Sequence, residues 1–163
     1  MASVQRLNHA VLWVRDARIS AEFYCDVLGF EVVTDLGPGQ AMFLRASGSG
    51  NHHDLGIFSR GAAAASPARG SLGLYHLAWQ VDTIDELVEV QEQLRARNAI
   101  VGASDHGMSK SLYAVDPDGI EFEVVWMVPR SSWESDRTVA LDLGGEVRRW
   151  SGVATAAEAI QRL

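Results

Sequence analysis

Two histidines and one glutamate carry the chemistry that this sequence suggests most directly. His9 and His76 stand at the same point of two similar segments, residues 7–14 and residues 74–81, and are 67 positions apart. Glu123 lies in an otherwise apolar stretch, where an unpaired buried carboxylate is costly and needs a partner or a metal. Two imidazoles and one carboxylate hold Fe(II) in non-haem enzymes and also suit Mn(II), Ni(II) or Zn(II). We therefore predict that these three residues bind one metal ion, although a lone strand histidine is more often a satisfied core residue.

His53 is the next candidate, and it lies in residues 51–58, which end the first of two repeated copies of one arrangement. If residues 53–58 form a strand, alternation sends His53 and Asp54 to opposite faces. The ordinary pKa of imidazole, about 6.5, suits proton transfer at neutral pH, so His53 is a candidate general acid or base. Two other interpretations stay open: His52 and His53 end a loop, or Asp54 is a fourth metal ligand.

His106 and Tyr113 complete the set of candidates. His106 lies in residues 106–109, an expected loop, where a histidine is usually just exposed. Tyr113 lies ten residues before Glu123 in an expected strand, where an aromatic side chain often belongs to the core.

Composition limits the classes of protein that this chain can be. A length of 163 residues with 47% hydrophobic and 21% charged residues is typical of one globular domain. A net charge of -7 argues against nucleic acid as a partner, and no apolar run approaches the roughly 20 residues of a membrane span. Nothing at the N-terminus resembles a signal peptide, and Cys25 is the only cysteine. We therefore expect a cytoplasmic protein without an intrachain disulfide.

Two copies of one arrangement must position these residues. In each copy a strand leads into an amphipathic helix and then into three further strands. The first copy is expected to have strands near residues 6–14, 30–34, 41–46 and 53–58, and a helix near residues 17–28. The second copy is expected to have strands near residues 74–81, 100–103, 111–115 and 120–127, and a helix near residues 84–97. A connector of small residues, 59–72, joins the two copies.

Local signals support both helices. Ile19, Phe23 and Val27 share one face of the first helix, and Gly29 follows where a helix C-cap commonly falls. Thr83 and Glu86 have the spacing of a capping box at the start of the second helix.

The tail from residue 129 lies outside the repeat. Thr155 and Glu158 again have the spacing of a capping box, so we expect a short C-terminal helix. This extension either covers the open mouth of a site or packs on a second subunit. The predicted fold class is therefore α+β: a single domain with one module near residues 4–60, a second near residues 72–128, and an extension over residues 129–163.

Three segments together resemble the vicinal-oxygen-chelate (glyoxalase/bleomycin-resistance/dioxygenase) superfamily. They are residues 7–14, then Phe-Tyr-Cys-Asp-Val-Leu-Gly-Phe at 23–30, and Asp-Pro-Asp-Gly-Ile-Glu-Phe-Glu at 116–123. The last of these resembles the strand that carries the metal-binding carboxylate in that superfamily. The resemblance covers about residues 4–128 and implies two tandem βαβββ modules that form one half-open barrel around a metal site.

Within that superfamily the chain is most similar to the type I extradiol ring-cleaving dioxygenases, in a one-domain form. The resemblance implies Fe(II), with Mn(II) as the other candidate. The implied metal ligands are His9, His76 and Glu123. The resemblance further implies that His53 is the catalytic acid/base, and that His106 and Tyr113 act beside the substrate. The 23-residue gap between His53 and His76 is longer than in close relatives.

The implied reaction sets the expected partners and the alternatives. The partners are a small aromatic diol (a catechol) and O2, and we expect a homo-oligomer. In this scheme His53 takes the second catechol proton. One alternative is a glyoxalase-like metal-dependent lyase or isomerase, which needs a fourth ligand, for which Asp54 is a candidate. The other is a metal-free protein of the same fold that binds a small molecule such as a drug.

Overall fold

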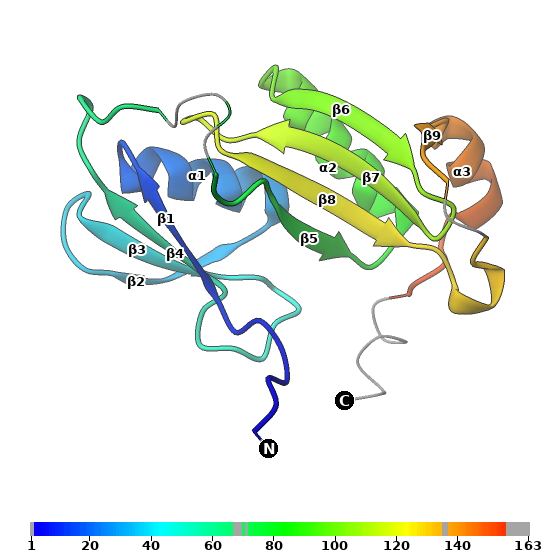
Figure 1. Cartoon of the computed structure of the whole chain (residues 1–163), viewed down its shortest axis with the longest axis horizontal. Coiled ribbons are helices and arrows are strands. Elements are labelled where there is room, and N and C mark those ends of the chain that lie inside the picture. Colours follow the sequence, from blue (N-terminus) through cyan, green and yellow to red (C-terminus); the bar gives the residue numbers. More distant parts are fainter. Residues whose placement is uncertain (1, 67–69, 71, 135–136, 156–163) are drawn as a thin grey trace. The chain divides into compact units, whose positions relative to one another are not determined.

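The computed structural model describes residues 2–66, 70, 72–134 and 137–155. It divides into two compact units, Met1–Ser71 and Leu72–Leu163. Each unit has its own β-sheet with helices packed on it, so the fold class is α+β as predicted, and neither sheet closes into a barrel (Figure 1).

The first unit has the predicted βαβββ order. Its elements are β1 (Ala10–Val14), α1 (Ala17–Leu28), β2 (Glu31–Asp35), β3 (Ala41–Arg45) and β4 (Leu55–Ser59). The sheet order is β1-β4-β3-β2, with β1 parallel to β4 and the other pairs antiparallel. The parallel pairing places the start of β1 beside the start of β4, and therefore brings the segments before these two strands together.

Helix α1 begins and ends where its capping residues dictate. The Asp16 side chain accepts a hydrogen bond from the backbone N–H of Arg18, and Gly29 takes a left-handed conformation with φ of 66°. The prediction of residues 17–28 is confirmed. Phe23 and Val27 are buried as expected, but Ile19 is 56% exposed, so the apolar stripe does not extend to the first turn of the helix.

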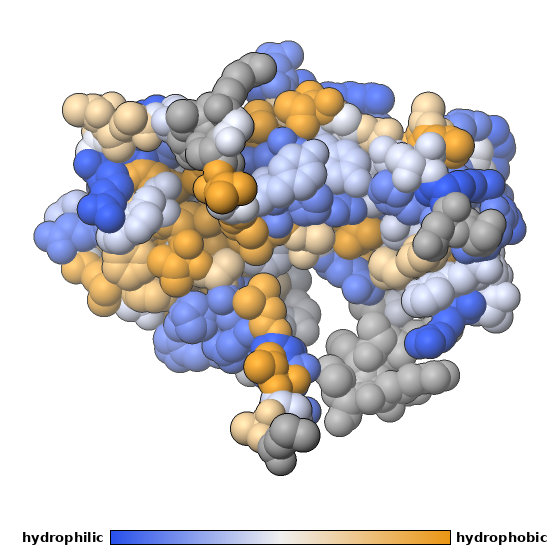
Figure 2. Space-filling view, viewed as in Figure 1, coloured by the Kyte–Doolittle hydropathy of each residue, from blue (hydrophilic) through white to orange (hydrophobic). Residues whose placement is uncertain are grey.

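The sheet of the first unit has one covered face and one open face. Helix α1 packs against β3 and β4, where Leu44, Leu55 and Ile57 are fully buried. On the other face Trp13 is 56% exposed and the guanidinium of Arg60 lies 3.4 Å from the centre of its ring. Apolar side chains are visible over this unit in Figure 2. The covered face therefore forms the core, and the open face carries the candidate site residues.

The second unit repeats this order and extends it. Its elements are β5 (Leu77–Val81), α2 (Ile84–Ala96), β6 (Ile100–Asp105), β7 (Ser109–Val115), β8 (Glu121–Met127), the 3-10 helix η1 (Arg130–Ser132), β9 (Val139–Ala140) and α3 (Leu143–Trp150). The sheet order is β5-β8-β7-β6-β9, with β5 parallel to β8. The capping box of Thr83 and Glu86 is present at the start of α2. The second module is therefore built like the first.

The C-terminal extension packs on its own unit. Strand β9 pairs antiparallel with β6, with Ala140 opposite Ser104 and Val139 opposite Asp105, and α3 packs against α2. The sequence analysis did not predict α3. The helix that it did predict, from the capping box of Thr155 and Glu158, lies mostly outside the described residues. Thr155 itself is buried, and its backbone N–H donates to Asp82.

No helix in the described parts of the chain has both the length and the apolar composition to cross a membrane.

Candidate metal centre and its neighbouring groups

His9 and His76 occupy the same structural position in their two units. His9 is the residue before β1, and His76 is the residue before β5. Both expected strands are therefore shorter at their N-terminal ends than predicted, because strand pairing begins only at Ala10 and Leu77. The equivalence of the two histidines, inferred from the sequence repeat, is thus a property of the backbone as well.

In the first unit His9 lies against His53. Their ring centres are 4.7 Å apart, and the ring of Phe43 on β3 lies 4.8 Å from that of His53 on another side. His53 precedes β4, so the alternation of a strand does not apply to it. The contact between the two histidines follows instead from the parallel pairing of β1 with β4.

The surroundings of His53 favour its neutral form. Burial lowers the pKa of His53, and the neighbouring imidazoles of His9 and His52 lower it further. The Nδ1 atoms of His52 and His53 are 3.1 Å apart. When His53 donates its Nδ1–H in this contact, its Nε2 is the ring atom that can accept a proton.

Asp54 is occupied by the loop that precedes β4. One carboxylate oxygen accepts a hydrogen bond from the backbone N–H of Ala46 at 2.9 Å. The other accepts from the Ser49 hydroxyl and from the Asn51 amide, both at 2.7 Å. This carboxylate therefore closes the loop, and its environment does not favour the alternative in which Asp54 is a metal ligand.

In the second unit His76 and Glu123 face each other. His76 Nε2 lies 3.1 Å from Glu123 Oε2, and the Glu123 side chain is 13% exposed. Glu123 comes from β8, which is parallel to β5 and places Glu123 opposite Ala78. The costly buried carboxylate that the sequence suggested thus has a partner, and this partner is one of the two predicted histidine ligands.

Tyr113 and His106 extend this group along the sheet. Tyr113 on β7 is the direct cross-strand neighbour of Glu123, and its ring centre is 5.8 Å from that of His76. The Tyr113 hydroxyl is 2.9 Å from Nε2 of His106, which lies in the loop between β6 and β7. Burial raises the pKa of Tyr113, and the negative charge of Glu123 raises it further, so the phenol keeps its proton at neutral pH.

The structure therefore collects the predicted site residues into two groups. His9 and His53 lie together in the first unit, and four residues lie together in the second: His76, Glu123, Tyr113 and His106. Within neither unit do the described residues bring three His, Cys, Asp or Glu side chains together as a metal site would. The sequence analysis missed Thr138, whose hydroxyl is 3.1 Å from His106 Nδ1. No local pattern marks this residue, because its partner is 32 positions away.

Comparison with known proteins identifies the family. The model of the Glyoxalase/Bleomycin resistance protein/Dioxygenase superfamily matches residues 6–124. The chain belongs to this superfamily. Its resemblance to that family, inferred from three sequence segments, is therefore confirmed. The family name itself covers several reactions, so membership alone leaves the chemistry to be argued from the site.

Individual relatives of this superfamily member include dioxygenases. A catechol-2,3-dioxygenase from Bacillus subtilis is 31% identical over 146 residues, which are 85% of this chain and 50% of that protein. A biphenyl-2,3-diol 1,2-dioxygenase from Rhodococcus globerulus is 28% identical over 120 residues, 73% of this chain and 61% of that protein. The chain thus spans half to three fifths of the length of these relatives.

A solved structure shows the same fold. The glyoxylase/bleomycin resistance protein/dioxygenase domain from Frankia sp. EAN1pec superposes with a TM-score of 0.62 at 22% identity, covering 77% of this chain and 94% of that one.

The spacing of two donor atoms in the second unit is compatible with a divalent metal ion. Two adjacent ligands of an octahedral ion, each about 2.1 Å from it, are about 3.0 Å apart. The distance between His76 Nε2 and Glu123 Oε2 is 3.1 Å. His76 Nδ1 is buried and has no hydrogen-bond partner among the residues that the structure describes.

Proposed function

We propose that this chain is an extradiol ring-cleaving dioxygenase that uses Fe(II) and O2 to open a catecholic substrate. The observation that carries the proposal is the grouping of His76, Glu123, Tyr113 and His106 in the second unit. The names of the two dioxygenase relatives support the same reaction class.

The proposed metal ligands are His9, His76 and Glu123. Fe(II) is the proposed ion, and Mn(II) is the alternative. The bound ion would supply a Lewis acid for the two oxygens of the substrate and an electron donor for O2. The supporting observations are the equivalent places of His9 and His76 before β1 and β5, and the donor spacing of His76 and Glu123.

His53 is the proposed base. Its lowered pKa keeps the imidazole neutral at neutral pH, so Nε2 can accept the proton of a substrate hydroxyl and return it later to the product. The rings of Phe43 and His9 both lie against the His53 ring and restrict its rotation.

Tyr113 is the proposed hydrogen-bonding group at the substrate: its oxygen accepts from a substrate hydroxyl while its own proton is donated to His106 Nε2. Its phenol stays protonated because of burial and the charge of Glu123. His106 Nε2 holds the hydroxyl from the side at 2.9 Å, so the position of the Tyr113 oxygen is fixed before a substrate arrives.

The lyase alternative finds less support. It requires a fourth ligand, typically a carboxylate on the last strand of the first module. Strand β4 reads Leu-Gly-Ile-Phe-Ser and carries no carboxylate, and Asp54 is committed to its loop.

Metal loading followed by oxygen uptake tests the proposal. The protein is reconstituted anaerobically with Fe(II), and O2 consumption is followed with a panel of catechols. We expect a yellow ring-opened semialdehyde. Glu123→Ala should lose stoichiometric Fe(II), whereas Glu121→Ala, two residues away on β8, should keep it. Full Fe(II) occupancy in the Glu123→Ala protein would contradict the ligand assignment, and an intradiol product would contradict the reaction.

A further inference from the structure

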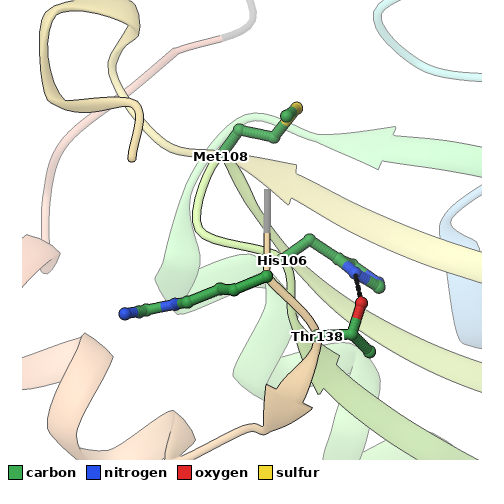
Figure 3. A pocket seen from close by; sticks show the side chains of 4 residues that line it. His106, Met108 and Thr138 are labelled. Carbon is green, nitrogen blue, oxygen red and sulfur yellow. Dashed lines mark hydrogen bonds between the residues drawn. The ribbon is translucent and has the colours of Figure 1, made fainter. Parts of the chain in front are cut away.

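Among the described residues of the C-terminal extension, Thr138 contacts the candidate site. The Thr138 hydroxyl lies 3.1 Å from His106 Nδ1, and Figure 3 shows the two side chains meeting beside a pocket of about 520 Å³. Met108 and Arg137 complete the lining of this pocket. His106 is therefore held at both ring nitrogens, by Thr138 on one side and by the Tyr113 hydroxyl on the other.

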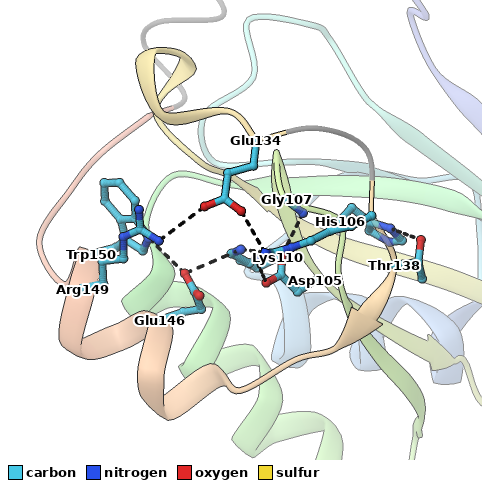
Figure 4. A network of polar contacts seen from close by, with 10 residues as sticks. Asp105, His106, Gly107, Lys110, Glu134, Thr138, Glu146, Arg149 and Trp150 are labelled. Carbon is cyan, nitrogen blue, oxygen red and sulfur yellow. Dashed lines mark hydrogen bonds and ion pairs between the residues drawn. The ribbon is translucent and has the colours of Figure 1, made fainter.

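A network of buried charges fixes the position of the segment that carries Thr138. The Asp105 side chain is 8% exposed and accepts hydrogen bonds from Arg137 at 2.7 Å and from Lys110 at 2.6 Å. Lys110 is 2% exposed and also lies 3.6 Å from Glu146 on α3 (Figure 4). Arg137 is paired a second time, with Glu134 at 2.8 Å. The extension is thus attached to β6 and β7 by ion pairs, of which those of Lys110 are buried and those of Arg137 are partly exposed.

Both neighbours of Thr138 in the chain are tied to the same residue. Arg137, just before it, forms the ion pair with Asp105, and Val139, just after it, is the strand partner of Asp105 in the pairing of β9 with β6. Asp105 is in turn the residue before His106. This double attachment sets Thr138 opposite the His106 ring, so the contact does not depend on a freely moving loop.

The two contacts admit two proton arrangements at His106, because the Thr138 and Tyr113 hydroxyls can each donate or accept. A phenol is a better hydrogen-bond donor than a neutral imidazole N–H, which favours the arrangement in which Tyr113 donates to Nε2 of His106. The proton of the neutral ring then lies on Nδ1, and the Thr138 oxygen accepts it. In this arrangement Thr138 favours one tautomer, and that tautomer presents an acceptor to Tyr113.

We propose that Thr138 is a positioning residue that holds His106 in the Nδ1–H form and, through His106, orients the Tyr113 hydroxyl. The effect on catalysis rests on the proposed function, whereas the effect on the His106 tautomer does not. The role belongs to the extension, because residues 129–163 lie outside the repeated modules. Removing the hydroxyl should slow turnover by roughly 2- to 12-fold, the range of one neutral hydrogen bond. Water in the pocket beside His106 can replace part of the lost contact, which keeps the effect moderate.

The test compares Thr138→Val, which removes the hydroxyl at nearly constant volume, with Thr138→Ser, which keeps it. Thr34→Val on β2 of the first unit is the matched control. The first readout is the nitrogen NMR spectrum of the full-length chain, labelled at histidine and without added metal, with the His106 signals assigned from a His106→Gln variant. We expect Nδ1 protonated and Nε2 acting as an acceptor in the wild type, in Thr138→Ser and in Thr34→Val. We expect a mixture of tautomers in Thr138→Val.

The second readout is turnover of the Fe(II)-loaded proteins on a catechol. Thr138→Val should lower kcat at unchanged Fe(II) content, and Thr138→Ser should restore it. An unchanged His106 spectrum in Thr138→Val would overturn the inference, and so would an equal change in Thr138→Ser, because packing rather than the hydroxyl would then be responsible. A wild-type protein that shows the expected tautomer but consumes no O2 with any catechol would contradict the proposed function and leave the positioning role of Thr138 standing.

Discussion

Asp105→Asn is the substitution whose consequence the structure defines best. Burial raises the pKa of Asp105, but hydrogen bonds from Lys110, from the backbone N–H of Gly107 and from Arg137 outweigh it and hold the pKa at about 2, below the ordinary 3.8. Asparagine has the shape of the protonated acid but carries no charge. The substitution therefore removes the electrostatic part of the interaction at nearly constant volume.

The size and the pH dependence of the effect follow from the two pKa values. One pKa unit corresponds to about 1.4 kcal/mol, so the charged form stabilises the folded protein by about 2 to 3 kcal/mol at pH 7. The folded-state pKa is the lower one, so this stabilisation is present above about pH 4 and is lost as the pH falls through about 2. At pH 3 about half of this stabilisation of the folded protein should remain.

Urea unfolding at pH 7, 4 and 3 measures this effect. The difference in the free energy of unfolding between the wild type and Asp105→Asn should be about 2 to 3 kcal/mol at pH 7 and should shrink toward pH 3. Glu89→Gln, at an exposed position of α2, should stay within about 0.5 kcal/mol of the wild type. A difference that is equally large at pH 7 and pH 3 would refute the electrostatic argument, and so would a difference no larger than that of the Glu89→Gln control.

Two further substitutions separate the roles of neighbouring residues in the first unit. His53→Phe should keep stoichiometric Fe(II) and bind catechol, while its turnover falls by roughly 10²- to 10⁴-fold. The turnover of His52→Phe should fall far less. Loss of iron in His53→Phe would make His53 a ligand instead. Asp54→Ala should lower the free energy of unfolding by about 1 to 3 kcal/mol because three hydrogen bonds of its loop are lost, and metal analysis should still find one ion per chain; a metal-free Asp54→Ala protein would restore Asp54 as a ligand.

Local signals in the sequence predicted the elements that depend on local interactions. The caps of α1 and the capping box of α2 lie within a few residues of the helices they bound, so these helices were predicted closely. The starts of β1 and β5 were predicted too early. The residues before them have strand-like composition, but strand pairing with β4 and β8 begins only at Ala10 and Leu77.

The extension escaped prediction for a different reason. Helix α3 contains Gly144 and Gly145, which weaken any helical signal, and Asp142 caps it through a contact to the backbone N–H of Gly145. Strand β9 has only two residues, and its position depends on β6. These elements exist because ion pairs and packing hold them against residues far away in the sequence, and periodicity does not reveal such contacts.

The candidate site residues likewise divide into those marked by local sequence signals and those brought together by distant contacts. The repeat identified His9 and His76, and the apolar surroundings identified Glu123, because both signals are local in the sequence. The contact between His9 and His53, and the chain of contacts from Tyr113 through His106 to Thr138, required the pairing of strands before they became visible.

The mass of the product formed from a catechol under isotopically labelled O2 tests the central claim most directly. The Fe(II)-loaded wild type should consume one O2 for each catechol, and the ring-opened product should have the mass of the catechol plus both labelled oxygen atoms when trapped before exchange with water. A product that contains no labelled oxygen, or substrate turnover that proceeds equally well without O2, would contradict the assignment of this chain as a ring-cleaving dioxygenase.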